Sequence, residues 1–201
     1  MTIPYPQLET EGIKNQKILQ AIRRLPRELF VSENFKESAY VNSPLPIDCG
    51  QTISQPFIVA YMSEKLSLKN TDKVLEIGTG SGFQTAVLAQ LVSEVYTVEI
   101  YPELGQKAQR LLNKLGYQNI KYRIGDGKLG WENFAPFDKI IITAATLEIP
   151  FLLVKQLKIG GKMLLPLANN WGEQDLILIT KIQTGKIAQK QLIPVRFVPL
   201  L

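Results

Sequence analysis

The segment "PLPIDCGQTISQPF", residues 44–57, carries polar side chains that could orient a substrate. Thr52 and Ser54 offer hydroxyls and Gln51 offers an amide, in a run that contains several prolines and Gly50. A hydroxyl can donate a hydrogen bond to a substrate carboxylate, and it can also accept one from a backbone N–H. Two hypotheses are therefore open for Ser54: it orients a substrate, or it caps a helix that begins at Pro56.

A second group of residues predicts a ligand-binding loop. "LEIGTGSG" places Gly78, Gly80 and Gly82 between an apolar run and a helical pattern. The spacing is G-x-G-x-G and differs from the G-x-G-x-x-G of the dinucleotide fingerprint. Glycines allow a tight turn and a close approach of the backbone to a ligand. Because ligands of open parallel sheets bind at the carboxyl ends of the strands, we expect these glycines to bind a cofactor.

Three carboxylates accompany this loop. Glu99 ends the next apolar run, 99 − 78 = 21 residues after the first glycine, where an acidic side chain meets ribose hydroxyls in such folds. Asp126 ends the third run, within reach of a nucleotide base, and Glu76 lies just ahead of the glycines. This acidic setting disfavours a pyrophosphate and favours a cation with a ribose diol, which predicts S-adenosylmethionine. The alternative is a plain tight turn with Glu99 at a solvated strand end.

Composition excludes several other kinds of chemistry. The chain has no histidine and one cysteine, Cys49, which rules out a Ser-His-Asp triad, a Cys-His pair and nearly every histidine-based metal site. We therefore expect no metal, and we interpret Cys49 as a small buried filler. The net charge is +5 with scattered lysines, so we expect no nucleic-acid partner.

The sequence also shows no pattern of a membrane span or a signal peptide. No apolar run is long enough for a membrane span, and "MTIPYPQLETEG" lacks the pattern of a signal peptide. We expect a cytoplasmic monomer that does not bind membranes.

The elements that must position these residues follow from the apolar pattern. Strands are predicted for "KVLEIG", "VYTVEI", "IKYRIGD" and "FDKIIITAA", and helices between them for "FQTAVLAQLV" and "ELGQKAQRLLNKLG". A helix over "PFLLVKQLK" is expected to end at Gly160–Gly161. Helices over 13–25 and 57–67 precede this region. The strands "KMLLPLA", "DLILITKI" and "LIPVRFVPL" close the chain, with "QTGK" as the turn of a hairpin.

This order predicts a doubly wound α/β fold. Alternating strands and helices imply right-handed crossovers and a mostly parallel sheet with helices on both faces. An N-terminal helical layer and antiparallel C-terminal strands complete it. We expect a single domain over 1–201, divided into 1–70 (helices and active-site loop), 71–168 (cofactor-binding core) and 169–201 (C-terminal strands).

The chain resembles the protein-L-isoaspartate O-methyltransferase family over residues 13–201. The motifs that carry the resemblance are "PRELFV", "PLPI", "GQTISQP", "VLEIGTGSGFQTA", "GDG", "PFDKIIITAA", "EIP", "LKIGGKMLLPL" and "PVRFVPL". It implies a Rossmann-like methyltransferase that moves a methyl group from S-adenosylmethionine to the free carboxylate of L-isoaspartyl residues in damaged proteins and peptides. Repair to aspartate would follow, with S-adenosyl-L-homocysteine as the other product.

The resemblance also implies roles for individual residues. Ser54 matches the family's active-site serine. The positions that match cofactor contacts are Thr52, Ile53, Gly78, Glu99, Asp126 and Gly127, and those that match the substrate's backbone contacts are Ala144, Ala145, Val195 and Arg196. Arg196 has a second interpretation as a surface residue at a strand edge. The chain departs from the family's common pattern at Asp48–Cys49, at "AATLEIP" and in ending directly after "VPL".

A carboxylate acceptor fits the missing histidine. A side-chain-like carboxyl with a pKa of about 4 is ionised at neutral pH, so it needs no general base. What remains is to position it and exclude water, and one serine hydroxyl suffices for orientation. Two alternatives stay open: an S-adenosylmethionine-dependent methyltransferase acting on RNA or a small molecule, and a catalytically inactive cofactor-binding protein.

Overall fold

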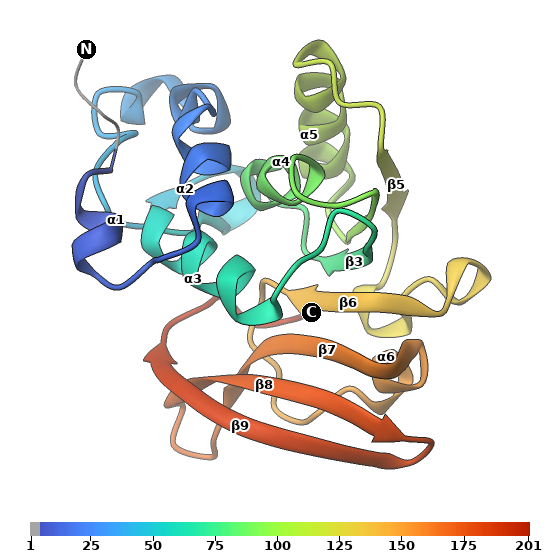
Figure 1. Ribbon diagram of the computed structural model, residues 1–201. Coiled ribbons are helices and arrows are strands. Elements are labelled where there is room, and N and C mark those ends of the chain that lie inside the picture. Colours follow the sequence, from blue (N-terminus) through green and yellow to red (C-terminus); the bar gives the residue numbers. More distant parts are fainter. Residues whose placement is uncertain (1–4) are drawn as a thin grey trace.

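The computed structural model describes residues 5–201, and a seven-stranded sheet forms its centre (Figure 1). In spatial order its strands are β5 (Ile120–Ile124), β4 (Glu94–Glu99), β3 (Lys73–Ile77), β6 (Phe137–Ile142), β7 (Leu157–Ala168), β8 (Gln174–Gln183) and β9 (Lys186–Val195). The strands from β5 to β7 pair in parallel, and β8 and β9 are antiparallel. The predicted sheet is confirmed, including the hairpin at its end.

Burial on both faces explains the apolar strands. Leu75 and Ile77 of β3 pack in one core cluster with α6 (Phe151–Lys155), while Val74 packs in another with α3 and α4. The helices of that second face are α3 (Pro56–Leu66), α4 (Phe83–Ala89) and α5 (Pro102–Lys114). Strands covered on both sides have no polar face, so their apolar runs are nearly continuous. The predicted helices on both faces are confirmed.

The strand order reverses at β3. Its neighbours are β4 on one side and β6 on the other, and the chain crosses between them. At such a switch point the loops after adjacent strands diverge and leave a crevice at their carboxyl ends. Figure 1 shows the arrowhead of β6 directed toward the N-terminal helices, with the C-terminus beside it.

The N-terminal layer consists of short elements around α3. It contains α1 (Gln7–Thr10), α2 (Gln16–Arg23), the 3-10 turns η1 (Arg27–Phe30) and η2 (Glu33–Phe35), and a two-residue hairpin of β1 (Leu45–Pro46) and β2 (Thr52–Ile53). The 3-10 turn η3 (Asp48–Gly50) joins the two hairpin strands. Asn15 caps α2, because its side chain accepts from the Lys17 N–H at 3.0 Å. This layer packs against α3, and α2 also contacts α4.

Two predicted boundaries are wrong. The helix expected to reach Gly160–Gly161 ends at Lys155, and both glycines lie inside β7. Leu157 pairs with Phe137 and Lys162 with Lys139, so the residues between them form a bulge, and Gly160 adopts a φ of +77° there. A glycine pair that serves a bulge has the same sequence signature as one that ends a helix.

The last strand also differs from the prediction. It begins at Lys186, six residues earlier than "LIPVRFVPL", because β9 pairs with β8 from the turn onward. It ends at Val195, and the residues that follow leave the sheet edge. The division of the chain at residues 70 and 168 stays a prediction.

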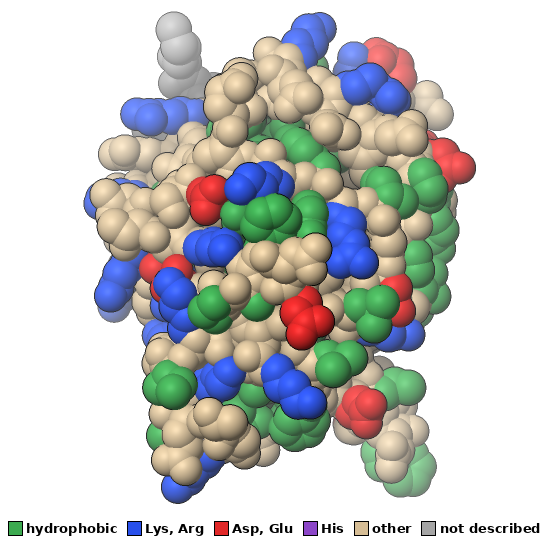
Figure 2. Space-filling view, turned by 90° about the vertical axis from the view of Figure 1, so that its right-hand side faces the viewer, with side chains coloured by type: hydrophobic (Ala, Val, Ile, Leu, Met, Phe, Trp, Pro, Cys, Tyr) green, Lys and Arg blue, Asp and Glu red, His purple; other side chains and the backbone are tan. Residues whose placement is uncertain are grey.

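The described surface has two further properties. No helix within residues 5–201 is long and apolar enough to cross a membrane. In Figure 2, the Lys and Arg side chains of the face shown are spread among apolar and acidic ones and form no dense block.

Candidate functional site

A cleft lies over the carboxyl ends of β3, β4 and β6. It consists of two adjoining cavities of about 70 and 40 Å³ that share Thr52, Gly78, Gly80 and Thr143 in their linings. The loop after each strand contributes to it, together with the segment around β2. The structure therefore brings the glycine loop and the "QTIS" segment to one place, as the sequence predicts.

Gly78 is the tightest point of this cleft. Its φ is +93°, and a Cβ at this position would overlap the hydroxyl of Thr143. Thr143 Oγ1 lies 2.7 Å from the Gly78 carbonyl and 3.0 Å from the Ile77 carbonyl, so it fixes the start of the loop. The sequence analysis missed Thr143. The available signal was a hydroxyl directly after a buried strand that neighbours the glycine loop.

The other glycines have different tasks. Gly80 lines both cavities, and Gly127 lines the larger one, where a Cβ would overlap Ile77. Gly82 lies at the start of α4 with a φ of +88°, and its Cβ would come within 3.1 Å of Leu112 on α5. Gly82 lets two helices pack closely and lines neither cavity, so its predicted cofactor contact stays a prediction.

Glu99 is joined to the glycine loop. Its Oε2 accepts from the Gly80 N–H at 2.7 Å, and its Oε1 accepts from the Tyr101 N–H at 3.1 Å. The side chain is buried and lines the larger cavity. Because each carboxylate oxygen has two lone pairs, both can accept a further hydrogen bond from a ligand hydroxyl.

Glu76 lies apart from the cleft lining. It is fully buried beneath α4, where its Oε2 accepts from the hydroxyls of Thr85 and Thr97 at 2.6 and 2.7 Å. Burial raises the pKa of Glu76 to about 8, against the lowering effect of those two hydroxyls. Glu76 is therefore mostly neutral at pH 7, and its place is a link between β3, β4 and α4.

Asp126 also serves a local role. Its Oδ1 accepts from the Lys128 N–H at 2.8 Å and so caps the 3-10 turn η4 (Gly127–Leu129). The side chain lines neither cavity, while the adjacent Gly127 does. A contact between Asp126 and a nucleotide base stays a prediction.

The structure tests one of the two hypotheses for Ser54, the helix cap. The residue at the N-cap of α3 is Gln55, without a side-chain cap, and the Phe57 N–H is instead bound at 3.0 Å by Oδ1 of Asn42. The cap hypothesis is therefore wrong. Ser54 lines the smaller cavity, and within residues 5–201 its hydroxyl makes no hydrogen bond. Thr52 lines both cavities, and the buried Ile53 lines the smaller one.

The predicted substrate residues fall into two places. Ala144 lines the larger cavity, and the next residue, Ala145, pairs with the C-terminal segment: its N–H donates to the Val198 carbonyl at 2.7 Å, and its carbonyl accepts from the Leu200 N–H at 2.8 Å. Val195 and Arg196 line neither cavity. Residues 198–201 line the larger cavity, a place that the sequence did not predict for them, and the substrate contacts expected for Val195 and Arg196 stay predictions.

The segment before "QTIS" forms an ion pair with α5. Asp48 Oδ2 lies 2.7 Å from Lys107 Nζ. Cys49 is exposed with a φ of +57°, so the expectation of a buried filler is wrong. Desolvation raises the pKa of the Cys49 thiol, and so do the carboxylates of Glu103, Asp48 and Glu99. The thiol is therefore kept protonated and is a poor nucleophile.

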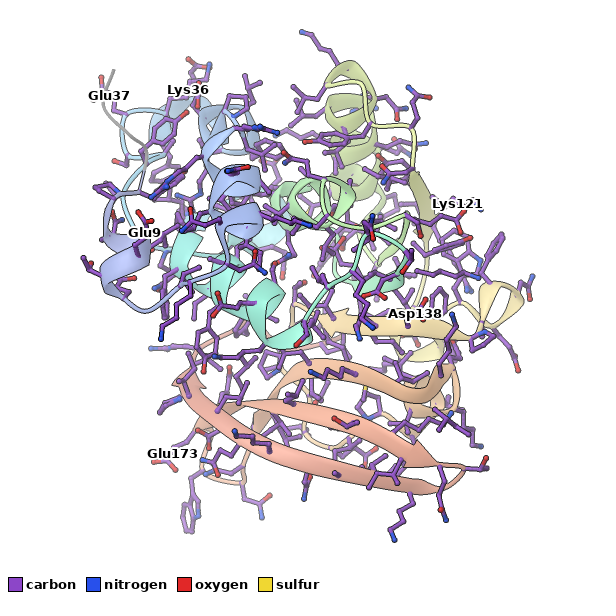
Figure 3. All side chains as sticks on the ribbon, viewed as in Figure 1. Glu9, Lys36, Glu37, Lys121, Asp138 and Glu173 are labelled. Atoms are coloured by element: carbon purple, nitrogen blue, oxygen red, sulfur yellow. The ribbon has the colours of Figure 1, made fainter. Side chains whose placement is uncertain are left out.

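The charge of the cleft limits what it can bind. Among the residues 5–201 that line it, Glu99 is the one charged side chain, and no lysine or arginine is present. Figure 3 labels six other charged side chains, none of which lines the cleft: Glu9, Lys36, Glu37, Lys121, Asp138 and Glu173. Such a site suits a cation with hydroxyl groups and disfavours a polyphosphate. No group of three or more His, Cys, Asp or Glu residues within 5–201 could hold a metal ion.

Comparisons with known proteins agree with this chemistry. The family model of the protein-L-isoaspartate(D-aspartate) O-methyltransferases matches residues 5–201. The chain is 52% identical over 193 residues to the protein-L-isoaspartate O-methyltransferase of Dictyoglomus turgidum, covering 96% of this chain and 87% of the relative. It is 49% identical over 195 residues to that of Myxococcus xanthus, covering 96% and 92%.

Solved structures are similar as well. One protein-L-isoaspartate O-methyltransferase superposes with a TM-score of 0.86 at 28% identity, over 96% of this chain and 63% of that one. A Plasmodium falciparum protein of the same description, in complex with S-adenosyl-L-homocysteine, gives a TM-score of 0.86 at 24% identity, over 100% and 99% of the two chains. At 24% identity the second likeness concerns the fold alone.

Proposed function

Since the chain belongs to the protein-L-isoaspartate O-methyltransferase family, we propose that it methylates the free carboxylate of L-isoaspartyl residues in damaged proteins and peptides. S-Adenosylmethionine is the methyl donor, and the methylation initiates repair to aspartate. The observation that carries this proposal is the cleft itself: Glu99, bound to the glycine loop, lines one of its cavities, and Ser54 lines the adjoining one.

The lining of the cleft fits S-adenosylmethionine. Glu99 has lone pairs left for a ribose diol, and Gly78, Gly80 and Gly127 leave the backbone open to close approach. The cofactor carries a sulfonium and no phosphate, which agrees with a lining in which Glu99 is charged and, among residues 5–201, no lysine or arginine takes part. When bound, the cofactor supplies an electrophilic methyl group. Asp126 remains a proposed contact to its base.

Ser54 is proposed to orient the acceptor. A substrate carboxylate is already ionised near neutral pH, so no residue has to remove a proton. Its oxygen forms a bond to the methyl carbon while the carbon–sulfur bond breaks and the electron pair stays on sulfur. A neutral hydroxyl donor aligns the carboxylate without holding it as tightly as a lysine would in the ground state. The absence of histidine from the chain is consistent with this chemistry.

The acceptor is proposed to be a flexible polypeptide segment. Ala144 and the segment 198–201 line the same cavity, and Val195 and Arg196 precede that segment along the chain. Backbone groups here would pair with an extended substrate in the manner of an added strand. We propose isoaspartyl proteins and peptides as the partners of a monomer that binds no nucleic acid.

One assay tests the proposal directly. Methyl transfer from labelled S-adenosylmethionine is measured on an isoaspartyl peptide and on the aspartyl peptide of the same sequence. We expect a base-labile methyl ester on the isoaspartyl peptide alone. Equal labelling of both peptides, or no transfer at saturating peptide, would overturn the proposed acceptor.

A further inference from the structure

Arg27 occupies an unusual place in the N-terminal layer. It begins η1 in the "PRELFV" motif, and its side chain is fully buried. All four hydrogen bonds of its terminal nitrogens go to backbone carbonyls. Nη1 donates to the carbonyls of Ala39 and Val41, and Nη2 donates to those of Ser43 and Ser54 at 3.2 and 3.0 Å.

This arginine has no carboxylate partner within residues 5–201. Its other neighbours are the ring of Phe83, 5.6 Å from the guanidinium carbon, and the phenol of Tyr5, with which it interacts electrostatically. A buried charge without a counter-ion is costly, and an apolar side chain of similar size would fill the space at lower cost. Packing alone does not require an arginine here. The four hydrogen bonds to carbonyls therefore indicate that Arg27 organises the backbone around it.

The carbonyls bound by Arg27 come from two segments separated by the β1–β2 hairpin. Three belong to residues 39–43, and the fourth belongs to Ser54. A second contact joins the same segments, because the Asn42 side chain accepts from the Phe57 N–H at 3.0 Å. Asn42 and the Arg27 guanidinium therefore both bind the backbone of the segment from Ser54 to Phe57.

The position of the Ser54 hydroxyl depends on this anchorage. Ser54 lies between β2 and α3, outside regular secondary structure, and its hydroxyl makes no hydrogen bond within the described chain. One rotatable bond separates Oγ from the backbone, so the backbone at Ser54 sets where the hydroxyl can reach. A shift of about 1 Å in a group that aligns reactants can cost about 100-fold in rate.

We infer that Arg27 is a positioning residue for methyl transfer, which acts by fixing the backbone carbonyl of Ser54. The inference rests on the proposed function. It assigns a task to "PRELFV", which the mechanism does not otherwise use. Arg27 lines neither cavity of the cleft, so its effect passes through Ser54.

The test uses Arg27→Lys in the full chain. Lysine keeps the charge but has a single nitrogen, so it cannot hold carbonyls from both segments in the same geometry. We expect kcat on the isoaspartyl peptide to fall by about 10- to 100-fold. The Kd for S-adenosyl-L-homocysteine, measured by calorimetric titration, should stay within about twofold of the wild type, because no cleft lining changes.

A double-mutant cycle separates positioning from general destabilisation. In the Ser54→Ala background the hydroxyl is absent, so Arg27→Lys should lower kcat by less than about threefold further. Leu19 is fully buried in α2, and Leu19→Ala is the control for a loss of stability without a change near Ser54. It should lower the unfolding midpoint and leave kcat unchanged at temperatures where it is folded.

Three outcomes would overturn the inference: an unchanged kcat in Arg27→Lys, a loss of kcat that persists in full without the Ser54 hydroxyl, or an equal loss in Leu19→Ala. If Arg27→Lys fails to fold, Asn42→Ala carries the same test, since it removes the other tie to this segment. It should lower kcat by about 3- to 10-fold, again only when Ser54 is present. Wild-type protein that methylates no isoaspartyl peptide would refute the proposed function instead.

Discussion

The carboxylate of Glu99 accepts a hydrogen bond of 2.7 Å from the backbone N–H of Gly80. This contact joins the end of β4 to the loop after β3, so the acidic side chain and the glycine loop form one rigid surface. A ligand that binds the carboxylate is thereby placed against the glycines. The relationship explains why the two features occur together in the sequence.

Glu99→Gln tests this relationship. The amide oxygen can still accept from Gly80, but the –NH₂ group can accept neither from a ribose hydroxyl nor from the Tyr101 N–H. We expect affinity for S-adenosyl-L-homocysteine to fall by about tenfold, the equivalent of about 1.4 kcal/mol, and the lost Tyr101 bond to lower the free energy of unfolding by about 1 kcal/mol. Calorimetric titration measures the affinity. Unchanged affinity would show that the carboxylate binds the loop and not the cofactor.

Ser54→Ala should affect catalysis and not stability. The hydroxyl caps no helix, so the loss of about 1 kcal/mol expected for a missing cap does not apply. We expect kcat on the isoaspartyl peptide to drop by about 10- to 100-fold through lost alignment. Ser32→Ala, which alters a half-buried serine outside the cleft, is the control and should keep full activity. Equal turnover in both variants would contradict the role of Ser54.

Gly78→Ala and Gly116→Ala form a matched pair. Both glycines have positive φ, +93° and +87°, so alanine is strained at either position by about 1–2 kcal/mol. A Cβ at Gly116 meets open space, whereas one at Gly78 overlaps Thr143 in the cleft. Gly116→Ala should therefore lose stability alone, and Gly78→Ala should also lose binding of S-adenosyl-L-homocysteine. Unfolding and titration of both variants give the comparison, and equal binding would argue against a ligand at this loop.

Glu76→Gln should change how stability depends on pH. Burial raises the pKa of Glu76 to about 8 in the folded chain, above its ordinary value of 4.5. Between these values the folded chain holds a proton that the unfolded chain releases, so this group makes the protein less stable as pH rises. Glutamine resembles the protonated acid and has no proton to release, so the variant does not lose stability in this way as pH rises.

The free energy of unfolding of Glu76→Gln, relative to that of the wild type, should increase by roughly 1.4 kcal/mol per pH unit between about pH 5 and 8. Denaturant unfolding at pH 5, 6.5 and 8 measures the difference. A constant difference across this range would mean that Glu76 is ionised in the folded chain.

Much of the architecture could be predicted from local patterns. Buried parallel strands produce continuous apolar runs, as in "KIII" of β6, and the helices between them repeat apolar residues at helical spacing. The errors arose where one signal has two structural meanings. Gly160–Gly161 forms a bulge and not a helix end, because pairing with β6 extends past it.

The sequence alone determined which chemistry the chain can perform. The order of strands and loops places the glycines, Glu99 and Ser54 near a switch point, and the absence of histidine excludes mechanisms that use a histidine as general acid or base. These conclusions depend on residue types and on neighbours along the chain. They require no knowledge of long-range contacts.

Only the tertiary structure decided what each polar side chain does. Burial raises the pKa of Glu76, Ser54 is free of the helix cap, and Thr143 supports a loop 65 residues away. Arg27 binds the carbonyl of a residue 27 positions later. A hydrogen bond depends on which donor and acceptor meet once the layers pack, and sequence spacing carries no information about such partners.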